Sequence, residues 1–455
     1  MKEEAIAAIS TGLVPGGIGI VRISGEDAVR LTAPLVRIKG LELDQAEANH
    51  LYYGRIFDGG EQLDEALIAV FRAPHSYTAE DTVELQCHGG PLVLRRVLEA
   101  VCKQGVRLAQ PGEFTKRAFL NGRLDLSEAE AVMSLIQAET ALAQKTALSQ
   151  LSGSFSQLIR QMRAKILENT AFLEAALDDP EHYELQNYGE SIKPLIEELL
   201  RSIRSLLQSA DNGRMLAEGI RTAIIGRPNV GKSSFMNRLL GFERAIVTTI
   251  PGTTRDTIEE SFRYGELLLR LCDTAGIRDS EDPVEKIGID RSRELAEQAD
   301  LVLLLMDGSE PLEAEDEALA ALCPEKPCLI LLNKADLGLR ETPGSVSVRL
   351  GKPAFAISAK SGEGTEAVLE KIQELFRLSE IREQPYLVTN LRHKALLREA
   401  ETSLGYALET IRSKAPEDFL TIDLMDAYRA LGLIIGEEAG EDLINEIFGK
   451  FCMGK

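Results

Sequence analysis

The sequence has no tryptophan, few aromatic residues and no long apolar segment. Aromatic residues make up 5% of the 455 residues, and this fits helix-rich packing based on Leu and Ala. The longest apolar run, Leu301–Met306, is far shorter than the roughly 20 residues that cross a bilayer. The first residues, Met1–Glu4, are acidic and lead into no long apolar core. We therefore expect neither a signal peptide nor a membrane span.

Paired cysteines are also missing. The cysteines at positions 87, 102, 272, 323, 328 and 452 show no C-x-x-C spacing, which argues against a disulfide framework or a zinc knuckle. Cys323 and Cys328 lie next to an apolar strand, so we expect a buried pair of thiols there. A reducing, cytoplasmic location follows as the default expectation.

Positive charge is scarce, because 51 Lys and Arg stand against 72 Asp and Glu, for a net charge of −21. A chain of this charge does not hold nucleic acid over its whole surface, since the phosphate backbone would be repelled. A nucleic-acid substrate would need a local basic patch or a partner protein. The length predicts about three domains.

The stretch Gly226–Ser233 reads G-x-x-x-x-G-K-S. The apolar, β-branched run before it predicts a buried strand, and the spacing of Phe235–Leu240 predicts a helix. Such a loop directs backbone N–H groups and a helix N-terminus at a phosphate. Lys232 would reach the β- and γ-phosphates, and Ser233 would bind Mg²⁺. A chance glycine loop is the alternative, and the flanking elements disfavour it. The predicted nucleotide contacts of this loop are Asn229, Val230, Gly231, Lys232, Ser233 and Ser234.

Three further motifs each follow a predicted strand, as nucleotide-binding residues do in open α/β sheets. A carboxylate at Asp273 can orient a Mg²⁺-bound water, and the Gly276 N–H can sense a γ-phosphate. Asp336 can accept hydrogen bonds from N1–H and the 2-amino group of guanine, which adenine does not offer. The motifs together predict GTP as the substrate. They comprise Asp273, Thr274, Ala275 and Gly276; Asn333, Lys334, Ala335 and Asp336; and Ser358, Ala359 and Lys360, which would back the base.

A Thr/Gly-rich stretch between the first two motifs is the predicted switch I. Thr254 is the candidate second Mg²⁺ ligand, ordered only when a γ-phosphate is present. The predicted switch I contacts are Thr248, Thr249, Ile250, Pro251, Gly252, Thr253 and Thr254.

The chain order predicts a fold of α/β plus all-α class. We expect an N-terminal α/β domain at 1–118, a helical domain split into 119–217 and 381–455, and an inserted P-loop G domain at 218–380. The pair Ser127 and Glu130 predicts a capping box at the start of the first helical part. In the N-terminal domain, Asp81–Gly90 places an acid and a histidine at a strand end. This stretch is either a ligand-binding edge or, as its composition favours, a solvated strand end with its turn.

The inserted domain resembles the Ras-like translation-factor GTPases over its whole length. Ile277 stands where Ras-type enzymes carry a water-orienting Gln, so another catalytic device is needed. Asn229 and the long switch I are similar to those of the potassium-activated GTPases of the TrmE-Era-EngA type. That resemblance implies K⁺ ligands at Asn229, Thr248, Ile250 and Thr253, and a water-positioning role for Glu285. On physical grounds alone Glu285 would be a solvated loop acid.

Five further stretches carry a resemblance: Gly16–Arg22, Val83–Gly90, Pro111–Phe119, Asn121–Leu126 and Phe451–Lys455. Through them and the potassium-type G domain, the whole chain resembles the MnmE (TrmE) family of tRNA modification GTPases. The resemblance implies a tetrahydrofolate-binding, dimerising N-terminal domain, and contacts to 5-formyltetrahydrofolate from Arg22, Glu84, Arg123 and Lys455. Cys452 is implied as a catalytic thiol, although nothing local distinguishes this from a structural role.

The family's activity is then the expected one. With a flavin-dependent partner, MnmG (GidA), a homodimer in a heterotetramer or larger complex would add a carboxymethylaminomethyl or aminomethyl group to C5 of the wobble uridine of certain tRNAs. GTP, K⁺, Mg²⁺ and a one-carbon unit from a folate would be required. Two alternatives are an Era- or Der-like ribosome-assembly GTPase and a non-catalytic, nucleotide-switched scaffold. The first would carry an RNA-binding appendage or a second G domain; the second would show no effect of K⁺ on turnover.

Overall fold

The computed structural model describes residues 4–179, 188–241, 260–272, 288–323, 326–376 and 386–454. The chain divides into two compact units. Unit 1 comprises Met1–Ile136, Ala147–Lys193 and Thr402–Lys455, and unit 2 comprises Gln137–Thr146 and Pro194–Glu401.

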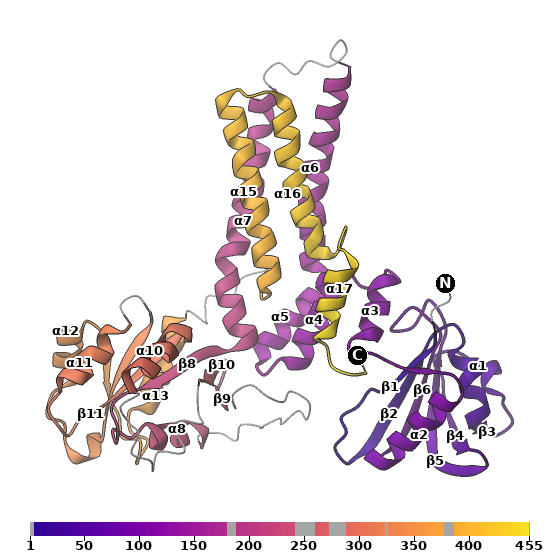
Figure 1. Cartoon of the computed structure of the whole chain (residues 1–455), viewed down its shortest axis with the longest axis horizontal. Coiled ribbons are helices and arrows are strands. Elements are labelled where there is room, and N and C mark those ends of the chain that lie inside the picture. The colour runs from indigo at the N-terminus through magenta and orange to yellow at the C-terminus, as the bar shows by residue number, and fades with distance from the viewer. Residues whose placement is uncertain are drawn as a thin grey trace. The chain divides into compact units, whose positions relative to one another are not determined.

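Unit 1 contains an antiparallel sheet near the N-terminus, with strand order β3-β4-β5-β6-β2-β1-β7 and one parallel pair, β1 with β7. Helix α2 packs on one face of this sheet, where the strands bury alternate residues. Helix α2 thus covers one face (Figure 1), whereas the other face packs on Phe114 at β1 and is open at β4 and β5. Its elements are β1 (Ile6–Ile9), β2 (Gly16–Ser24), α1 (Ala28–Thr32), β3 (Val36–Ile38), β4 (Leu51–Asp58), β5 (Glu61–Phe71), β6 (Thr82–Gly89), α2 (Pro91–Lys103), β7 (Arg107–Leu108) and α3 (Glu113–Leu120).

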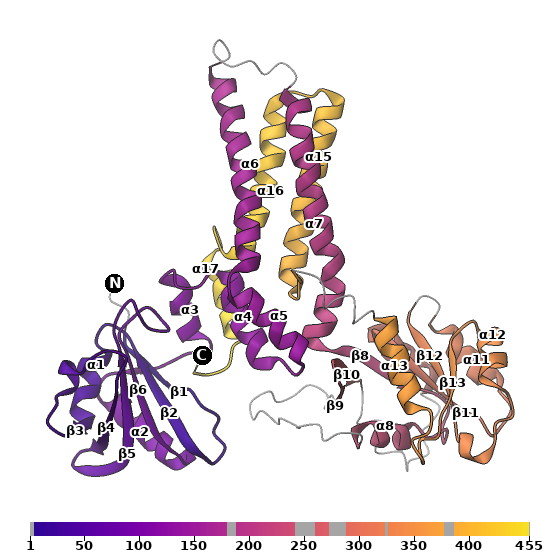
Figure 2. The ribbon, with the colours of Figure 1, turned by 180° about the vertical axis from the view of Figure 1, so that it is seen from behind.

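Long helices form the rest of unit 1 and lead into unit 2. Helices α6 and α16 lie side by side, as the views from the front (Figure 1) and from behind (Figure 2) show. The buried guanidinium of Arg163 lies 3.9 Å from the Tyr428 ring and pairs with Glu437, which ties the two helices together. The helices are α4 (Leu126–Gln137), α5 (Ala141–Leu151), α6 (Ser154–Asp178), α7 (Tyr188–Glu218), α15 (Leu391–Ser413), α16 (Glu417–Ile435) and α17 (Glu441–Gly449).

The predicted capping box at Ser127 and Glu130 is wrong by two residues. The backbone N–H of Asp125 donates to Glu128 Oε2 at 2.8 Å, and the Glu128 N–H donates to Asp125 Oδ1 at 2.9 Å. The helix begins at Leu126, so Asp125 is the capping residue, and Ser127 is buried inside the first turn. A helix that starts at Leu126 buries the Leu126 side chain. This burial favours the capping box of Asp125 and Glu128 over that of Ser127 and Glu130.

Unit 2 is built around a second sheet, with strand order β13-β12-β11-β8-β10-β9. All neighbours are parallel except β9 and β10, which form a hairpin. Its elements are β8 (Ile220–Ile225), α8 (Lys232–Leu240), β9 (Glu260–Tyr264), β10 (Leu267–Leu271), α10 (Gly288–Gln298), β11 (Leu301–Asp307), α11 (Ala314–Ala321), β12 (Cys328–Asn333), α12 (Pro343–Leu350), β13 (Ala354–Ala356) and α13 (Thr365–Leu375).

Both faces of this sheet are buried. In β11, Leu301, Leu303 and Leu305 join one core with α8 and α13, and the alternate residues join a second core with α10, α11 and α12. A strand covered on both faces has no polar alternation, which explains the unbroken apolar run at 301–306. The expected buried thiols, Cys323 and Cys328, lie in the second core, as predicted.

The predicted fold class is confirmed: an N-terminal α/β portion, helices from both halves of the chain, and a P-loop α/β module between them in sequence. The domain boundaries at 118, 217 and 380 stay predictions. Among the described residues, no helix is both long and apolar enough to cross a membrane.

The start of α4 can be tested by two substitutions two residues apart. Asp125→Ala removes the cap and the partner of Arg160, and should cost about 1 kcal/mol of unfolding free energy. Ser127→Ala removes a buried hydroxyl that has no hydrogen-bond partner among the described residues, and should be neutral or stabilising. Urea unfolding monitored by circular dichroism measures both. A larger loss for Ser127→Ala than for Asp125→Ala would contradict this assignment.

Candidate functional site

The phosphate loop lies between β8 and α8, at the carboxyl end of the central strand. Gly226 has φ +150°, and a Cβ placed there would lie 2.2 Å from the Leu305 carbonyl oxygen, so no side chain fits. Asn229 also takes a left-handed conformation, with φ +61°, and its side chain is exposed. Ser233 lies half-buried in the first turn of α8, and Ser234 is exposed beside it. The loop therefore has the strand–loop–helix context that a phosphate site requires.

Two neighbours outside the motif hold this loop. Arg227 donates from Nε to Asp316 Oδ1 at 2.9 Å and pairs with Glu313 at 2.6 Å. Asp316 is fully buried at the start of α11, where it also closes a capping box with Glu313. Lys232 donates to the Gly226 and Arg227 carbonyls at 2.8 and 2.7 Å. In the sequence, Asp316 stands three residues after Glu313. That spacing indicates the start of a helix, but it does not indicate that Asp316 supports a phosphate loop.

The predicted guanine-binding residues lie together at the ends of β12 and β13. Asn333 is 2% exposed, and its side chain donates to the Val230 carbonyl at 2.7 Å and accepts from the Ala359 N–H at 2.9 Å. The carboxylate of Asp336 is exposed and accepts from the Ser358 hydroxyl at 2.7 Å. Lys360 is exposed at the same edge, and Ala335 follows Lys334 in the loop. One buried amide thus joins the phosphate loop to both base-binding motifs.

Asp307 was not predicted as a site residue. It ends β11 directly opposite Asn333, accepts from Lys334 Nζ at 2.5 Å and accepts from the Ser309 hydroxyl at 2.6 Å. Burial by itself raises the pKa of Asp307, but the hydrogen bonds from Lys334 and Ser309 outweigh it and hold the pKa below its ordinary value. A carboxylate at the end of an otherwise apolar strand was the available signal.

A second group of predicted residues meets in unit 1. Arg22 on β2 and Glu84 on β6 are directly opposite each other, and Arg22 donates from Nε and Nη2 to Glu84 Oε1 at 2.9 and 2.8 Å. The guanidinium carbons of Arg22 and Arg123 lie 5.3 and 5.0 Å from the centre of the Tyr77 ring. Tyr77 was missed, because an aromatic residue in a loop has no spacing signal.

The chain's C-terminal segment returns to the N-terminal sheet. Helix α17 lies beside α3, and a Cβ on Gly454 would lie 3.0 Å from the Cα of Ser10, which follows β1 (Figure 1). Cys452 is half-buried, and its carbonyl accepts from the Gly112 N–H at 3.4 Å. The segment 451–454 therefore lies against the end of β1, and its place in one site with Arg22, Glu84 and Arg123 stays a prediction. In the rest of the Asp81–Gly90 stretch, Val83, Leu85 and Cys87 are buried in the core of the sheet. His88, near the end of β6, is exposed and pairs with Asp64.

Several predicted residues cannot be placed. The switch residues, the water-positioning acid and the last lysine lie outside the residues that the structure describes: Thr248, Thr249, Ile250, Pro251, Gly252, Thr253, Thr254, Asp273, Thr274, Ala275, Gly276, Glu285 and Lys455.

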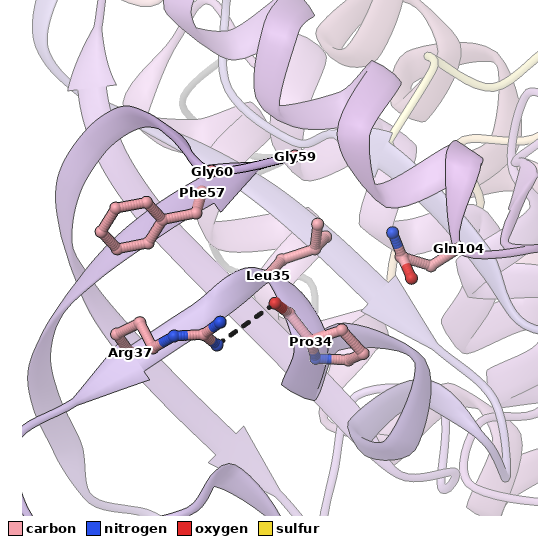
Figure 3. A pocket seen from close by; sticks show the side chains of 7 residues that line it. All are labelled: Pro34, Leu35, Arg37, Phe57, Gly59, Gly60 and Gln104. Atoms are coloured by element: carbon pink, nitrogen blue, oxygen red, sulfur yellow. Dashed lines mark hydrogen bonds between the residues drawn. The ribbon is translucent and has the colours of Figure 1, made fainter.

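A separate pocket of about 390 Å³ lies in the N-terminal domain (Figure 3). Arg37 contacts two other lining residues: its guanidinium donates to the Pro34 carbonyl at 3.3 Å and lies 5.9 Å from the centre of the Phe57 ring. No predicted site residue that the structure describes lines it, so we assign it no part in the sites above. The lining residues are Pro34, Leu35, Arg37, Phe57, Gly59, Gly60 and Gln104.

The bridging role of Asn333 gives a direct test. Asn333→Ala leaves the buried Val230 carbonyl and Ala359 N–H without their partner, at about 1–3 kcal/mol for each unpaired group. GDP affinity should fall about 10- to 100-fold, measured by titration with a fluorescent guanine nucleotide. Asn237→Ala, on the exposed side of α8, is the matched control and should change affinity less than twofold. An equal affinity for the Asn333 variant and the natural chain would contradict the bridge.

Comparison with known proteins agrees with this arrangement along the whole chain. The family model described as GTP-binding protein TrmE N-terminus matches residues 5–123, and the one described as MnmE helical domain matches residues 126–452. The chain is 45% identical to the tRNA modification GTPase MnmE of Lachnoclostridium phytofermentans and 44% identical to that of Carboxydothermus hydrogenoformans, each over 100% of both chains. That of Geobacillus kaustophilus is 44% identical over 99% of both. The chain therefore belongs to the MnmE (TrmE) family of tRNA modification GTPases.

Proposed function

We propose that this GTPase acts with the flavin-dependent protein MnmG (GidA) to add a carboxymethylaminomethyl or aminomethyl group to C5 of the wobble uridine of certain tRNAs, using a one-carbon unit from a folate. The observation that carries the proposal is the Arg22–Glu84 site in a chain that also holds a guanine-nucleotide site. Similarity over the full length, rather than over the P-loop module alone, favours this function over ribosome assembly. The chain is acidic, so MnmG would supply much of the positive surface that binds tRNA. The complex would act in the cytoplasm.

The Arg22 site fits a folate. The Nη1 of Arg22 and the hydroxyl of Ser10 are buried and have no hydrogen-bond partner among the described residues. Buried donors of this kind are normally paired, so both atoms are able to hydrogen-bond a ligand or water. Glu84 can accept from the N–H edge of a pterin, and Arg22, Arg123 and Lys455 can meet the carboxylates of the glutamate tail. When bound, the folate supplies the one-carbon unit.

Folate binding can be measured without GTP, tRNA or a partner. Arg22→Gln should weaken binding of 5-formyltetrahydrofolate about 10- to 100-fold, because charge-assisted hydrogen bonds are worth about 1.5–3 kcal/mol. Isothermal titration calorimetry on the full chain gives the affinity. The control is Arg96→Ala on α2, which breaks the exposed ion pair between Arg96 and Glu61 of β5. Unchanged affinity in the Arg22 variant would remove the folate site from this position.

The nucleotide site fits magnesium and potassium through its donor set. Ser233 and Thr254 would hold Mg²⁺, and Asn229, Thr248, Ile250 and Thr253 would hold K⁺, of which Ser233 and Asn229 are described. All are oxygen donors, as hard cations require. K⁺ supplies the positive charge that an arginine finger gives other GTPases. Glu285 would position the attacking water in place of the missing Gln.

The potassium assignment is tested by turnover. GTP hydrolysis should be on the order of 10³-fold faster in K⁺ than in Na⁺ at equal ionic strength, and Asn229→Ala should abolish most of that preference. Asn237→Ala, at an exposed position on α8, is the control and should keep the preference for K⁺. Equal rates in both salts would remove K⁺ from the site. If K⁺ acts by pairing two G domains, a spin-label distance between them should shorten with a GTP analogue in K⁺ alone.

A homodimer is part of this proposal. On the open face of the N-terminal sheet, Tyr53 and Leu67 are directly opposite each other and are 61% and 40% exposed, and Leu51 is 60% exposed on the same face. Exposed apolar clusters of this kind often mark protein contacts. A dimer formed there would assemble with MnmG into a heterotetramer or larger complex. A catalytic role of Cys452, in the segment that reaches the folate site, stays a prediction.

A further inference from the structure

The side chain of Arg227 anchors the phosphate loop to a helix outside the nucleotide motifs. This side chain is 12% exposed, and it donates from Nε to Asp316 Oδ1 at 2.9 Å. Its Nη1 also lies 2.6 Å from Glu313 Oε1, but Glu313 is 58% exposed, so this second contact adds little. Asp316, which is fully buried in the first turn of α11, is therefore the main anchor of the loop.

The position of Asp316 is also fixed from the side of α11. Its Oδ2 accepts from the backbone N–H of Glu313 at 3.0 Å, which is one half of the capping box of this helix. Helix α11 is itself held against the sheet, because Leu319 and Ala320 lie in the second core together with residues of β11. One oxygen of the carboxylate thus binds the helix start, and the other binds the phosphate loop.

The anchor reaches Lys232 through the backbone of Arg227. Lys232 Nζ donates to the Arg227 carbonyl at 2.7 Å and to the Gly226 carbonyl at 2.8 Å. Arg227 precedes Pro228, and a residue before proline has few allowed backbone conformations. The side chain and the carbonyl of Arg227 therefore move together, so the anchor also sets the place of the Lys232 ammonium group.

A different side chain holds the base end of the site. Asn333 joins the Val230 carbonyl, later in the phosphate loop, to the Ala359 N–H beside the base-binding residues. Asn333 lies at the end of β12, whereas Asp316 lies on the helix that follows β11. The start of the phosphate loop therefore has a support of its own, separate from the amide that joins the loop to the base end.

We propose that Asp316 is a positioning residue for the phosphates of the nucleotide. Through Arg227 it holds Lys232 where the β-phosphate binds, and it thereby sets how strongly the site prefers GDP to guanosine monophosphate (GMP). This role of Asp316 rests on the predicted contact between Lys232 and the β-phosphate, and it is independent of the folate, tRNA and MnmG proposals. Because GMP has no β-phosphate, loss of the anchor should weaken the binding of GDP and leave that of GMP nearly unchanged.

The test compares GDP and GMP affinity in the full-length protein carrying Asp316→Asn, by displacement of a fluorescent guanine nucleotide. The asparagine keeps an oxygen for the Glu313 N–H, so the helix cap remains, but its NH₂ group cannot accept from Arg227. We expect GDP affinity to fall about five- to tenfold, at the lower end of measured couplings between sites, and GMP affinity to change by less than about twofold.

Two further variants show what each result means. Glu317→Gln makes the corresponding change at the next position on α11, where it breaks the exposed pair with Arg349, and should leave both affinities unchanged. Lys232→Ala removes the predicted phosphate contact itself and should lower the preference for GDP more than Asp316→Asn does. If Lys232→Ala leaves the preference unaltered, the predicted contact is wrong and the role of Asp316 falls with it. If Lys232→Ala lowers the preference but Asp316→Asn does not, only the role of Asp316 is overturned.

A double-variant cycle tests whether the two partners act through one bond. Arg227→Gln breaks the same hydrogen bond from the loop side and should also lower GDP affinity while sparing GMP. The variant with both changes should show no larger loss than Arg227→Gln alone, since the bond can be lost only once. Losses that multiply in the double variant would show that the two residues act separately, and equal losses of GDP and GMP affinity would show general damage to the module. Either result would contradict the proposal.

Discussion

The nucleotide site depends on one buried amide. Asn333 joins the phosphate loop, through the Val230 carbonyl, to the loop that backs the base, through the Ala359 N–H. Both bonds lie in the protein interior, where an unpaired partner is costly, so the two loops keep a fixed separation. Nucleotide recognition needs that fixed separation, because the phosphates and the base are opposite ends of one ligand. The charged groups that contact the nucleotide can then stay exposed while their supports are buried.

The parallel sheet makes this bridge possible. Its strands end at one edge in register, so that Asp307 of β11 lies directly opposite Asn333 of β12. Ion pairs then lock the loops that leave the strands: Lys334 binds Asp307, and Arg227 of the phosphate loop binds buried Asp316. These supporting acids come from the strand and the helix that follow the switches in sequence. The phosphate loop is therefore held by side chains far along the chain: 89 residues separate Arg227 from Asp316, and 103 separate Val230 from Asn333.

The second site depends on a different constraint, the return of the C-terminal segment to the N-terminal sheet. Gly454 has φ +84°, and a Cβ there would lie 2.4 Å from the Ile9 carbonyl oxygen, so only glycine permits the close approach. The segment before it is held by Phe448 and Phe451, which pack in the same core as Leu126. The arginines around Tyr77, by contrast, come from β2 and from the loop after α3. The proposed folate site, with residues from both ends of the chain, can form only when the intervening chain has folded.

The sequence by itself determined the elements that depend on local patterns. The loop at 226–233, the strands that end at Asn333 and at Ala356, and the helices around α2 and α16 follow from glycine placement and from apolar periodicity. Tertiary structure decided what periodicity does not encode. The sequence pattern predicts Ser127 as the cap of α4, whereas the structure has Asp125, because a helix that starts at Leu126 buries that side chain. Tertiary structure also supplied Asp307, Asp316 and Tyr77, whose partners include residues distant in sequence. A side chain's role then depends on a neighbour that only the folded chain brings within hydrogen-bonding distance.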